Sequence, residues 1–92
     1  MADTLRLDKF LWFARIVKSR ALAQQLAEEG RIRIDGRVID RAHAPVRPGD
    51  VLSFALRGEV KVLRIESLPK RRGPPAEALS LYCELTSEGG QD

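Results

Sequence analysis

Cysteine and histidine are nearly absent from this sequence of 92 residues, which has one of each, Cys83 and His43. A lone cysteine can form neither an intrachain disulfide nor a thiolate zinc site. His43 has no partner at the spacing of a catalytic site, so its simplest interpretation is an exposed loop residue. We therefore expect no disulfide framework, no metal and no cofactor.

Glycine-rich phosphate loops and closely spaced carboxylate pairs are also missing. The glycines at 30, 36, 49 and 58 each fall at a turn or a helix end that explains them. The carboxylates are scattered, and Ser19 has no base nearby. These observations predict a protein that is not an enzyme and has no small-molecule substrate.

Long apolar runs are missing as well. None approaches the roughly 20 residues that a membrane-spanning helix needs, and the N-terminus shows no signal peptide. We expect a cytoplasmic protein that does not enter a membrane. The length predicts a single domain with one modest core.

Positive charge is present in excess and is unevenly distributed along the chain. The formal net charge is +3, residues 6–20 have a net charge of +4, and residues 31–47 have a net charge of +3. After Arg72 every charged residue is acidic. Any single arginine could equally lie on a solvated surface with scattered ion pairs, but the clustered set predicts a polyanionic partner.

Two helices are predicted in the N-terminal third. Apolar residues recur at helical spacing from Leu7 to Ala14, with Asp8 near the positive helix N-terminus. Further apolar residues lie off this stripe, so we expect a second element to cover the helix, including Trp12. A short connection over 16–18 follows. Ser19 then caps a second helix, which runs to about Glu29 and stops at Gly30.

A β-hairpin follows the second helix. The pair Asp35-Gly36 between alternating residues is a strong hairpin signal. Pairing across this turn places Ile32, Ile34 and Ile39 on one face, which we expect to pack under the helices. A Pro-Gly turn at 48–49 leads to a strand at 51–56, and a turn at 57–58 leads to a strand at 60–66.

The C-terminal segment is ambiguous. Residues 69–75 predict a basic Pro/Gly loop. Over 76–88 the alternation of Leu79, Leu81, Cys83 and Leu85 is typical of a strand, whereas the Pro-Pro start and the Ala, Leu and Glu content favour a helix. We expect a short helix at 76–88 that covers the first helix through Leu79 and Tyr82, and a disordered tail at 89–92. The predicted fold is α+β, with two N-terminal helices on a small, mostly antiparallel twisted sheet.

The junction of the two helices is the best organised basic feature. Arg15, Lys18 and Arg20 lie around this junction, where the N-terminus of the second helix suits phosphate. In a helix-turn-helix protein the second helix would enter the major groove of DNA, but here its far end is acidic. A helix junction beside a hairpin edge is better suited to structured RNA that is recognised by shape and backbone.

The order of these features resembles a known family. The stretches "RLDKFLWFARIVKSRALAQQLAEEGRIRIDGRVI" and "VRPGDVLSF" resemble the RNA-binding domain of ribosomal small-subunit protein four, the alpha-L motif, over residues 6–54. Asp35 stands where many members have Asn, and both residues tolerate the left-handed turn. The continuation "VKVLRIESLPKRRGPPAEALSLYCEL" resembles the stand-alone bacterial fifteen-kilodalton heat-shock protein and its short ribosome quality-control relatives. Some members have a long basic C-terminal tail, whereas this chain ends acidic at Asp92.

The resemblance implies an alpha-L type RNA-binding domain over 6–68 and binding to large ribosomal subunits that still hold peptidyl-tRNA after a translation failure. The partners would be large-subunit ribosomal RNA and tRNA, and we expect a monomer when the protein is free. Transferred by position, the RNA-facing residues would be Arg6, Lys9, Arg15, Lys18, Ser19, Arg20 and Gln24. The hairpin arginines Arg31, Arg33 and Arg37 would border the same surface. The alternative is a protein-interaction adaptor that docks acidic partners on this basic face.

Overall fold

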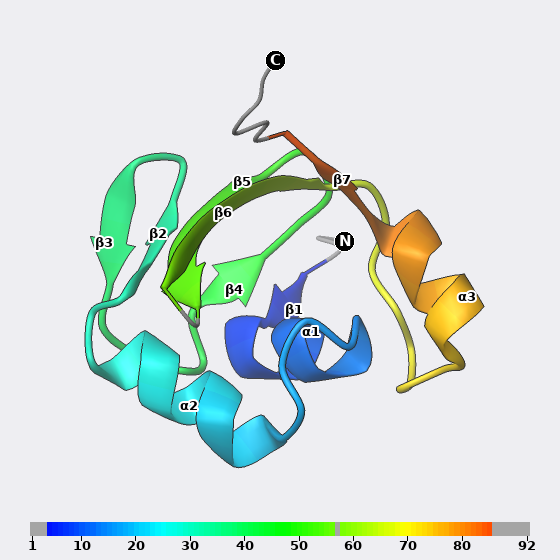
Figure 1. The fold of residues 1–92 in the computed structure, drawn as a ribbon, viewed down its shortest axis with the longest axis horizontal. Coiled ribbons are helices and arrows are strands. Elements are labelled where there is room, and N and C mark those ends of the chain that lie inside the picture. Colours follow the sequence, from blue (N-terminus) through cyan, green and yellow to red (C-terminus); the bar gives the residue numbers. More distant parts are fainter. Residues whose placement is uncertain (1–3, 57, 86–92) are drawn as a thin grey trace.

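The computed structural model describes residues 4–56 and 58–85, and it has an α+β architecture (Figure 1). The elements in chain order are β1 (Leu5–Arg6), α1 (Leu7–Phe13), α2 (Arg20–Glu28), β2 (Ile32–Ile34), β3 (Arg37–Ile39), β4 (Pro45–Val46), β5 (Val51–Leu56), β6 (Glu59–Ile65), α3 (Pro75–Ala78), a 3-10 turn (Leu79–Leu81) and β7 (Tyr82–Glu84).

A curved five-stranded sheet of order β3-β2-β5-β6-β7 forms one layer, and α1 and α2 lie together on one side of it (Figure 1). All its neighbouring strands are antiparallel. A separate two-stranded ladder pairs β1 with β4. The expected combination of two N-terminal helices and a mostly antiparallel sheet is therefore confirmed.

Local capping signals fix both ends of α2. The Ser19 hydroxyl accepts the N–H of Leu22 at 3.1 Å, which is an N-cap. At the other end Gly30 has a φ of 73°, and the N–H of Arg31 donates to the carbonyl of Leu26. This is a Schellman motif with glycine in the left-handed position. Both predicted ends of the helix are confirmed.

The hairpin also follows its sequence signal. Asp35 and Gly36 both have positive φ, 51° and 86°, as a type I′ turn requires. Ile32 pairs with Ile39 across the strands, and Ile32 is fully buried while Ile34 and Ile39 are half-buried against the core. The strands expected at 51–56 and 60–66 are found within one residue of these bounds.

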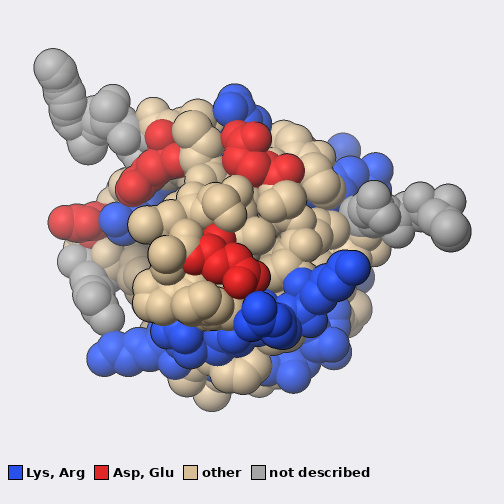
Figure 2. All heavy atoms as spheres, turned by 90° about the vertical axis from the view of Figure 1, so that its right-hand side faces the viewer, with Lys and Arg blue, Asp and Glu red and all other residues tan. Residues whose placement is uncertain are grey.

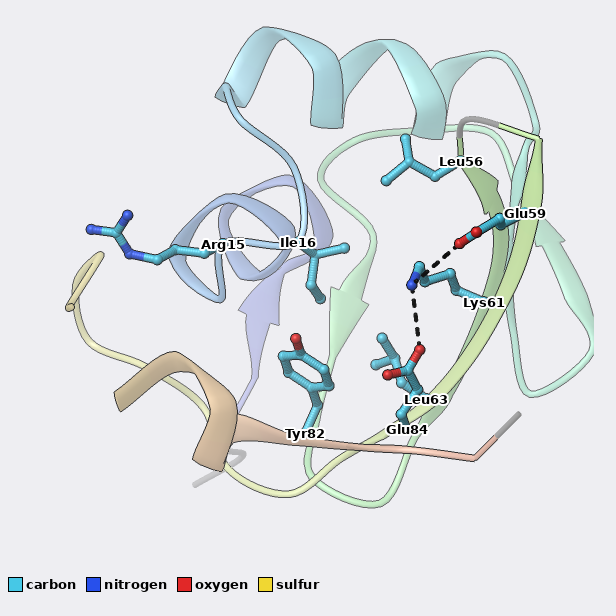
Figure 3. Close-up of a pocket in the computed structure, with 8 residues that line it drawn as sticks. All are labelled: Arg15, Ile16, Leu56, Glu59, Lys61, Leu63, Tyr82 and Glu84. Carbon is cyan, nitrogen blue, oxygen red and sulfur yellow. Dashed lines mark hydrogen bonds and ion pairs between the residues drawn. The ribbon is translucent and has the colours of Figure 1, made fainter. Parts of the chain in front are cut away.

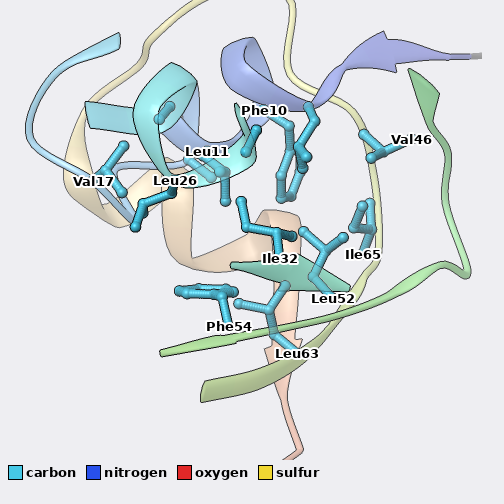
Figure 4. Close-up of a cluster of buried hydrophobic side chains, with 14 of the residues drawn as sticks. Phe10, Leu11, Val17, Leu26, Ile32, Val46, Leu52, Phe54, Leu63 and Ile65 are labelled. Carbon is cyan, nitrogen blue, oxygen red and sulfur yellow. The ribbon is translucent and has the colours of Figure 1, made fainter. Parts of the chain in front are cut away.

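One hydrophobic core lies between the helices and the sheet. In Figure 4 the side chains of Phe10, Leu11 and Leu26 face those of Ile32 and Leu52. The alternation along β5 and β6 places one face of each strand in this core. In the part of the chain that the structure describes, no helix has the length and apolarity needed to cross a membrane.

The segment expected to be a helix over 76–88 differs from that prediction. Its helix has four residues and ends at Ala78, and Tyr82–Glu84 form a strand that pairs with β6. Pairing with the open edge of β6 overrides the helix propensity of these residues. Leu79 does not cover α1, because it is 68% exposed, whereas Tyr82 is packed against the core. Residues 86–88 and the expected tail at 89–92 lie outside the described residues.

Candidate nucleic-acid interface

A buried carboxylate organises the start of α1. Asp8 is fully buried, and α1 has no side-chain N-cap. Instead the N–H groups of Leu7 and Asp8 donate to the carbonyls of Ala44 and Ala42, at 2.9 and 3.1 Å. These bonds satisfy two of the N–H groups that every helix leaves unpaired at its N-terminus, and they attach α1 to the segment that leads into β4.

Three side chains that were predicted to contact RNA converge on the Asp8 carboxylate. Arg6 donates to it through Nε at 3.0 Å and Nη2 at 2.9 Å, which is a bidentate pair. Gln24 donates Nε2 at 3.1 Å, and Arg20 approaches through Nε at 3.5 Å. Since Arg20 and Gln24 are four residues apart on α2, they lie on one helix face. We call Arg6, Asp8, Arg20 and Gln24 the Asp8 cluster.

The surroundings of Asp8 keep it ionised. Burial on its own raises the pKa of Asp8, but hydrogen bonds from Arg6 and Gln24, with the charges of Arg6 and Arg20, lower the pKa below its ordinary 3.8. The side chains of Arg6 and Arg20 are 43% and 38% exposed. Each guanidinium therefore contacts Asp8 on its inner side and still has N–H groups available to an anion outside.

The connection between the two helices begins with an unusual residue. Arg15 has a φ of 59°, and the N–H groups of Arg15 and Ile16 donate to the carbonyls of Trp12 and Leu11. This is the same Schellman motif that ends α2, with arginine where glycine is usual. A left-handed arginine is strained by about 1 kcal/mol or more. Such strain at a predicted binding residue favours a functional reason for the side chain.

The loop at 69–75 packs against this helix junction. The Nε of Arg15 donates to the carbonyl of Gly73 at 2.7 Å. Arg72 of the loop in turn donates through Nε to the carbonyl of Trp12 in α1 at 3.2 Å. Its guanidinium lies 5.4 Å from the centre of the Trp12 ring. Trp12 is thus half-buried, with Arg72 of this loop beside its ring, whereas the C-terminal segment was expected to cover it.

Basic residues of this loop extend the predicted surface. Figure 2 shows Lys and Arg side chains in a band across the lower part of the face that carries α3, with most acidic side chains above it. The lower part is the side on which α1 and α2 lie in Figure 1. Lys70 and Arg71 are exposed in the loop that contacts Arg15. This loop was predicted to be basic but was not placed in the site, although the run "KRRG" was a usable signal.

The other predicted junction residues have different roles. Ser19 is occupied as the N-cap of α2. Lys18 is exposed and Lys9 is half-buried. Neither ammonium has an ion pair within residues 4–56 and 58–85. These two cations are therefore available to an anion at the junction.

The hairpin arginines do not join the Asp8 cluster. Arg33 pairs with Val38 on the sheet face that points away from the core. Arg31 forms an ion pair with Glu29 at 3.0 Å. Arg37 lines a separate hollow beside β4. The ten predicted site residues thus divide into a junction group and a dispersed hairpin group.

A hollow of about 380 Å³ lies between the end of α1 and the strands β6 and β7 (Figure 3). Tyr82 points toward Ile16, and Lys61 bridges Glu59 and Glu84 at 3.7 and 3.4 Å. Burial, together with the charge of Glu84, raises the pKa of the Tyr82 hydroxyl. Within the described residues no group of three His, Cys, Asp or Glu side chains could hold a metal ion.

The substitution Asp8→Asn tests the cluster, because it keeps the shape of the side chain and removes its charge. We expect the free energy of unfolding at pH 7 to fall by about 1–3 kcal/mol, since Arg6 and Arg20 lose their buried partner. The folded-state pKa of Asp8 is lowered, so its stabilisation is complete above the unfolded pKa of about 4. This stabilisation is lost as the pH falls through the folded-state pKa of Asp8. The free energies of unfolding of the wild type and of Asp8→Asn therefore converge at low pH. Urea unfolding at pH 7, 5 and 3 measures this difference.

Asp40→Asn is the matched control, since Asp40 is exposed and its carboxylate has no partner within the described residues. This variant should change the free energy of unfolding by less than about 0.5 kcal/mol. A destabilisation by Asp8→Asn that stays constant from pH 7 to pH 3 would contradict the charge-based account.

Comparison with known proteins supports the resemblance deduced from the sequence. Residues 5–52 match the S4 domain family. The RQC P-site tRNA stabilizing factor of Bacillus subtilis (strain 168) is 36% identical over 84 residues, which is 91% of this chain and 95% of that protein. Heat shock protein 15 of Escherichia coli (strain K12) is 31% identical over 83 residues, which is 90% of this chain and 62% of that protein.

A solved structure agrees with the fold. The trimeric structure of Vibrio cholerae heat shock protein 15 superimposes with a TM-score of 0.83 at 32% identity, covering 89% of this chain and 82% of that one. The superimposed region extends past β5, so it includes elements outside residues 5–52, the part that matches the S4 domain family. The chain belongs to the S4 domain family and, over most of its length, to the family of small proteins that includes the RQC P-site tRNA stabilizing factor and heat shock protein 15.

Proposed function

We propose that this protein is a non-enzymatic RNA-binding protein of the cytoplasm that associates with the large ribosomal subunit. Its role would be rescue or quality control of stalled translation, with contacts to ribosomal RNA and to peptidyl-tRNA. The observation that carries this proposal is the convergence of Arg6, Arg20 and Gln24 on buried Asp8, beside the cations of the helix junction. The relative named for P-site tRNA supports the choice of partner.

The geometry explains how such a surface would bind RNA. Arg6 and Arg20 are held from behind by Asp8, so less side-chain entropy is lost when a phosphate binds in front. Lys9, Lys18 and Arg15 add cations around the same junction. Phosphate contacts of this kind position a protein on structured RNA through shape and backbone. The basic loop at 69–75 extends the surface toward the C-terminal segment.

The assembly state of the free protein is a separate prediction. The monomer expected from the sequence remains a prediction, because the similar Vibrio cholerae protein is described as trimeric. Multi-angle light scattering on the free protein measures its mass directly.

Salt dependence is the first test of RNA binding. The five junction cations Arg6, Lys9, Arg15, Lys18 and Arg20 should give a slope of log affinity against log salt of about −3.5 or steeper. This corresponds to a loss of affinity of about a hundredfold between 50 and 200 mM salt. Fluorescence anisotropy with labelled tRNA measures the slope. A binding constant independent of salt would contradict the proposed interface.

Charge reversal at Lys18 tests the junction on the ribosome. Lys18 is exposed, so Lys18→Glu should leave the fold intact while it places a carboxylate against phosphate. We expect co-sedimentation with large subunits that hold peptidyl-tRNA to weaken by at least about tenfold. Arg64→Glu, on the outer face of β6, is the charge-matched control and should co-sediment normally. Binding of Lys18→Glu equal to that of the control would remove the junction from the interface. A complex in lysate that survives RNase would favour a protein-interaction adaptor.

The substitution Arg15→Gly tests whether the Arg15 side chain binds RNA, because it removes the side chain and relieves the backbone strain at the same time. Glycine relieves the left-handed conformation, and this gain offsets the lost bond to Gly73, so the free energy of unfolding should change by less than about 1 kcal/mol. Binding to tRNA should nevertheless weaken, with a salt slope less steep by about 0.7. Thermal unfolding and anisotropy give the two readouts. Unchanged affinity would mean that Arg15 serves only to attach the loop at 69–75.

A further inference from the structure

A hollow lined by arginines lies beside β4, next to the β1–β4 ladder. Its volume is about 500 Å³. Three arginines line it, namely Arg37 at the start of β3, Arg41 after β3 and Arg47 after β4. Ile39 and Pro45 add apolar surface between them. We call this hollow the arginine groove.

The three guanidinium groups of the arginine groove are unpaired. Within residues 4–56 and 58–85, none of them has a hydrogen bond, an ion pair or a ring contact. This contrasts with Arg6 and Arg20, which share the Asp8 carboxylate. The three arginines exceed the two carboxylates of the lining, Asp35 and Asp50, so the hollow has a formal net charge of +1. An anion would relieve the repulsion among its cations.

The two carboxylates at the groove are already engaged by the backbone. Oδ1 of Asp35 accepts the N–H of Val51 at 3.0 Å, so this side chain connects the hairpin turn to the start of β5. Asp50 accepts the N–H of Arg47 at 3.1 Å through Oδ2. Both acidic side chains therefore serve to hold the turns that shape the groove. Among the described residues, no carboxylate therefore forms an ion pair with these three arginines.

The arginine groove lies next to the Asp8 cluster. Arg6 pairs directly with Pro45 across the β1–β4 ladder, and paired residues in an antiparallel ladder lie only about 5 Å apart. The N–H of Asp8 donates to the carbonyl of Ala42, one residue after Arg41. A strand of nucleic acid that is bound at Arg6 would therefore pass close to the arginine groove.

We propose that the arginine groove binds the phosphodiester backbone of the RNA strand that continues past Arg6. Arg41 and Arg47 are then phosphate contacts that the sequence analysis did not name, and Arg37 contacts RNA here and not at the helix junction. This inference rests on the proposed RNA-binding function and extends its footprint to the far side of β4. The apolar wall at Ile39 and Pro45 lies where a ribose would pack.

A charge-matched pair of double variants tests the groove. Arg41→Gln/Arg47→Gln removes two exposed cations whose side chains have no hydrogen bond, ion pair or ring contact within the described residues, so the fold should be retained. Lys61→Gln/Arg64→Gln removes two cations of β6 that already pair with carboxylates. Both variants have the same formal net charge. Any difference between them in RNA binding therefore reports position and not total charge.

Anisotropy with labelled tRNA between 50 and 300 mM salt is the readout, and circular dichroism checks the fold of each variant. For the groove variant we expect a salt slope less steep than that of the wild type by about 1.4, with weaker binding at every salt concentration. The control should keep the wild-type slope. A groove variant with the wild-type slope would overturn the inference and leave the junction interface standing. A wild-type protein that does not bind tRNA or ribosomal subunits would instead overturn the proposed function.

Discussion

The Asp8 carboxylate is the interaction on which the rest of the structure depends. It receives hydrogen bonds from Arg6, from Gln24 and from the N–H of Lys9, and Arg20 lies at the edge of hydrogen-bonding distance. One buried group thus connects β1, the first turn of α1 and one face of α2. Because its acceptor positions are filled by donors, the carboxylate adds no free negative charge to the surface. The contacts with Asp8 thus hold α1 and α2 together, and they also orient the guanidinium groups of Arg6 and Arg20.

The elements that local rules determine could be predicted from the sequence. The turn at Asp35-Gly36 and the cap at Ser19 each depend on residues within three positions, and both are found as expected. The face of the hairpin that packs inward followed from its register alone. The family could also be predicted from the sequence, because its signature combines these local signals in a fixed order. Short-range constraints of this kind need no knowledge of the tertiary structure.

The features that the sequence did not reveal depend on distant partners. Asp8 was interpreted as a charge beside a helix dipole, whereas its actual role needs residues 12 and 16 positions away. The end of α1 contains no glycine, so nothing local indicated that Arg15 would adopt a left-handed conformation. The strand β7 exists because β6 offers an unpaired edge, which propensity cannot show. Ten candidate residues were named, but their division into two groups required the fold.

The contacts between the helix junction and the loop at 69–75 have a consequence for biosynthesis. Arg15 and Gly73 are 58 residues apart in the chain, and Arg72 and Trp12 are 60 apart. Contacts of such long separation form late, after the intervening chain has closed. During translation, α1, α2 and the hairpin emerge first. The junction surface gains these contacts only once the loop at 69–75 has left the exit tunnel, so the nascent protein completes its set of basic contacts late in its own synthesis.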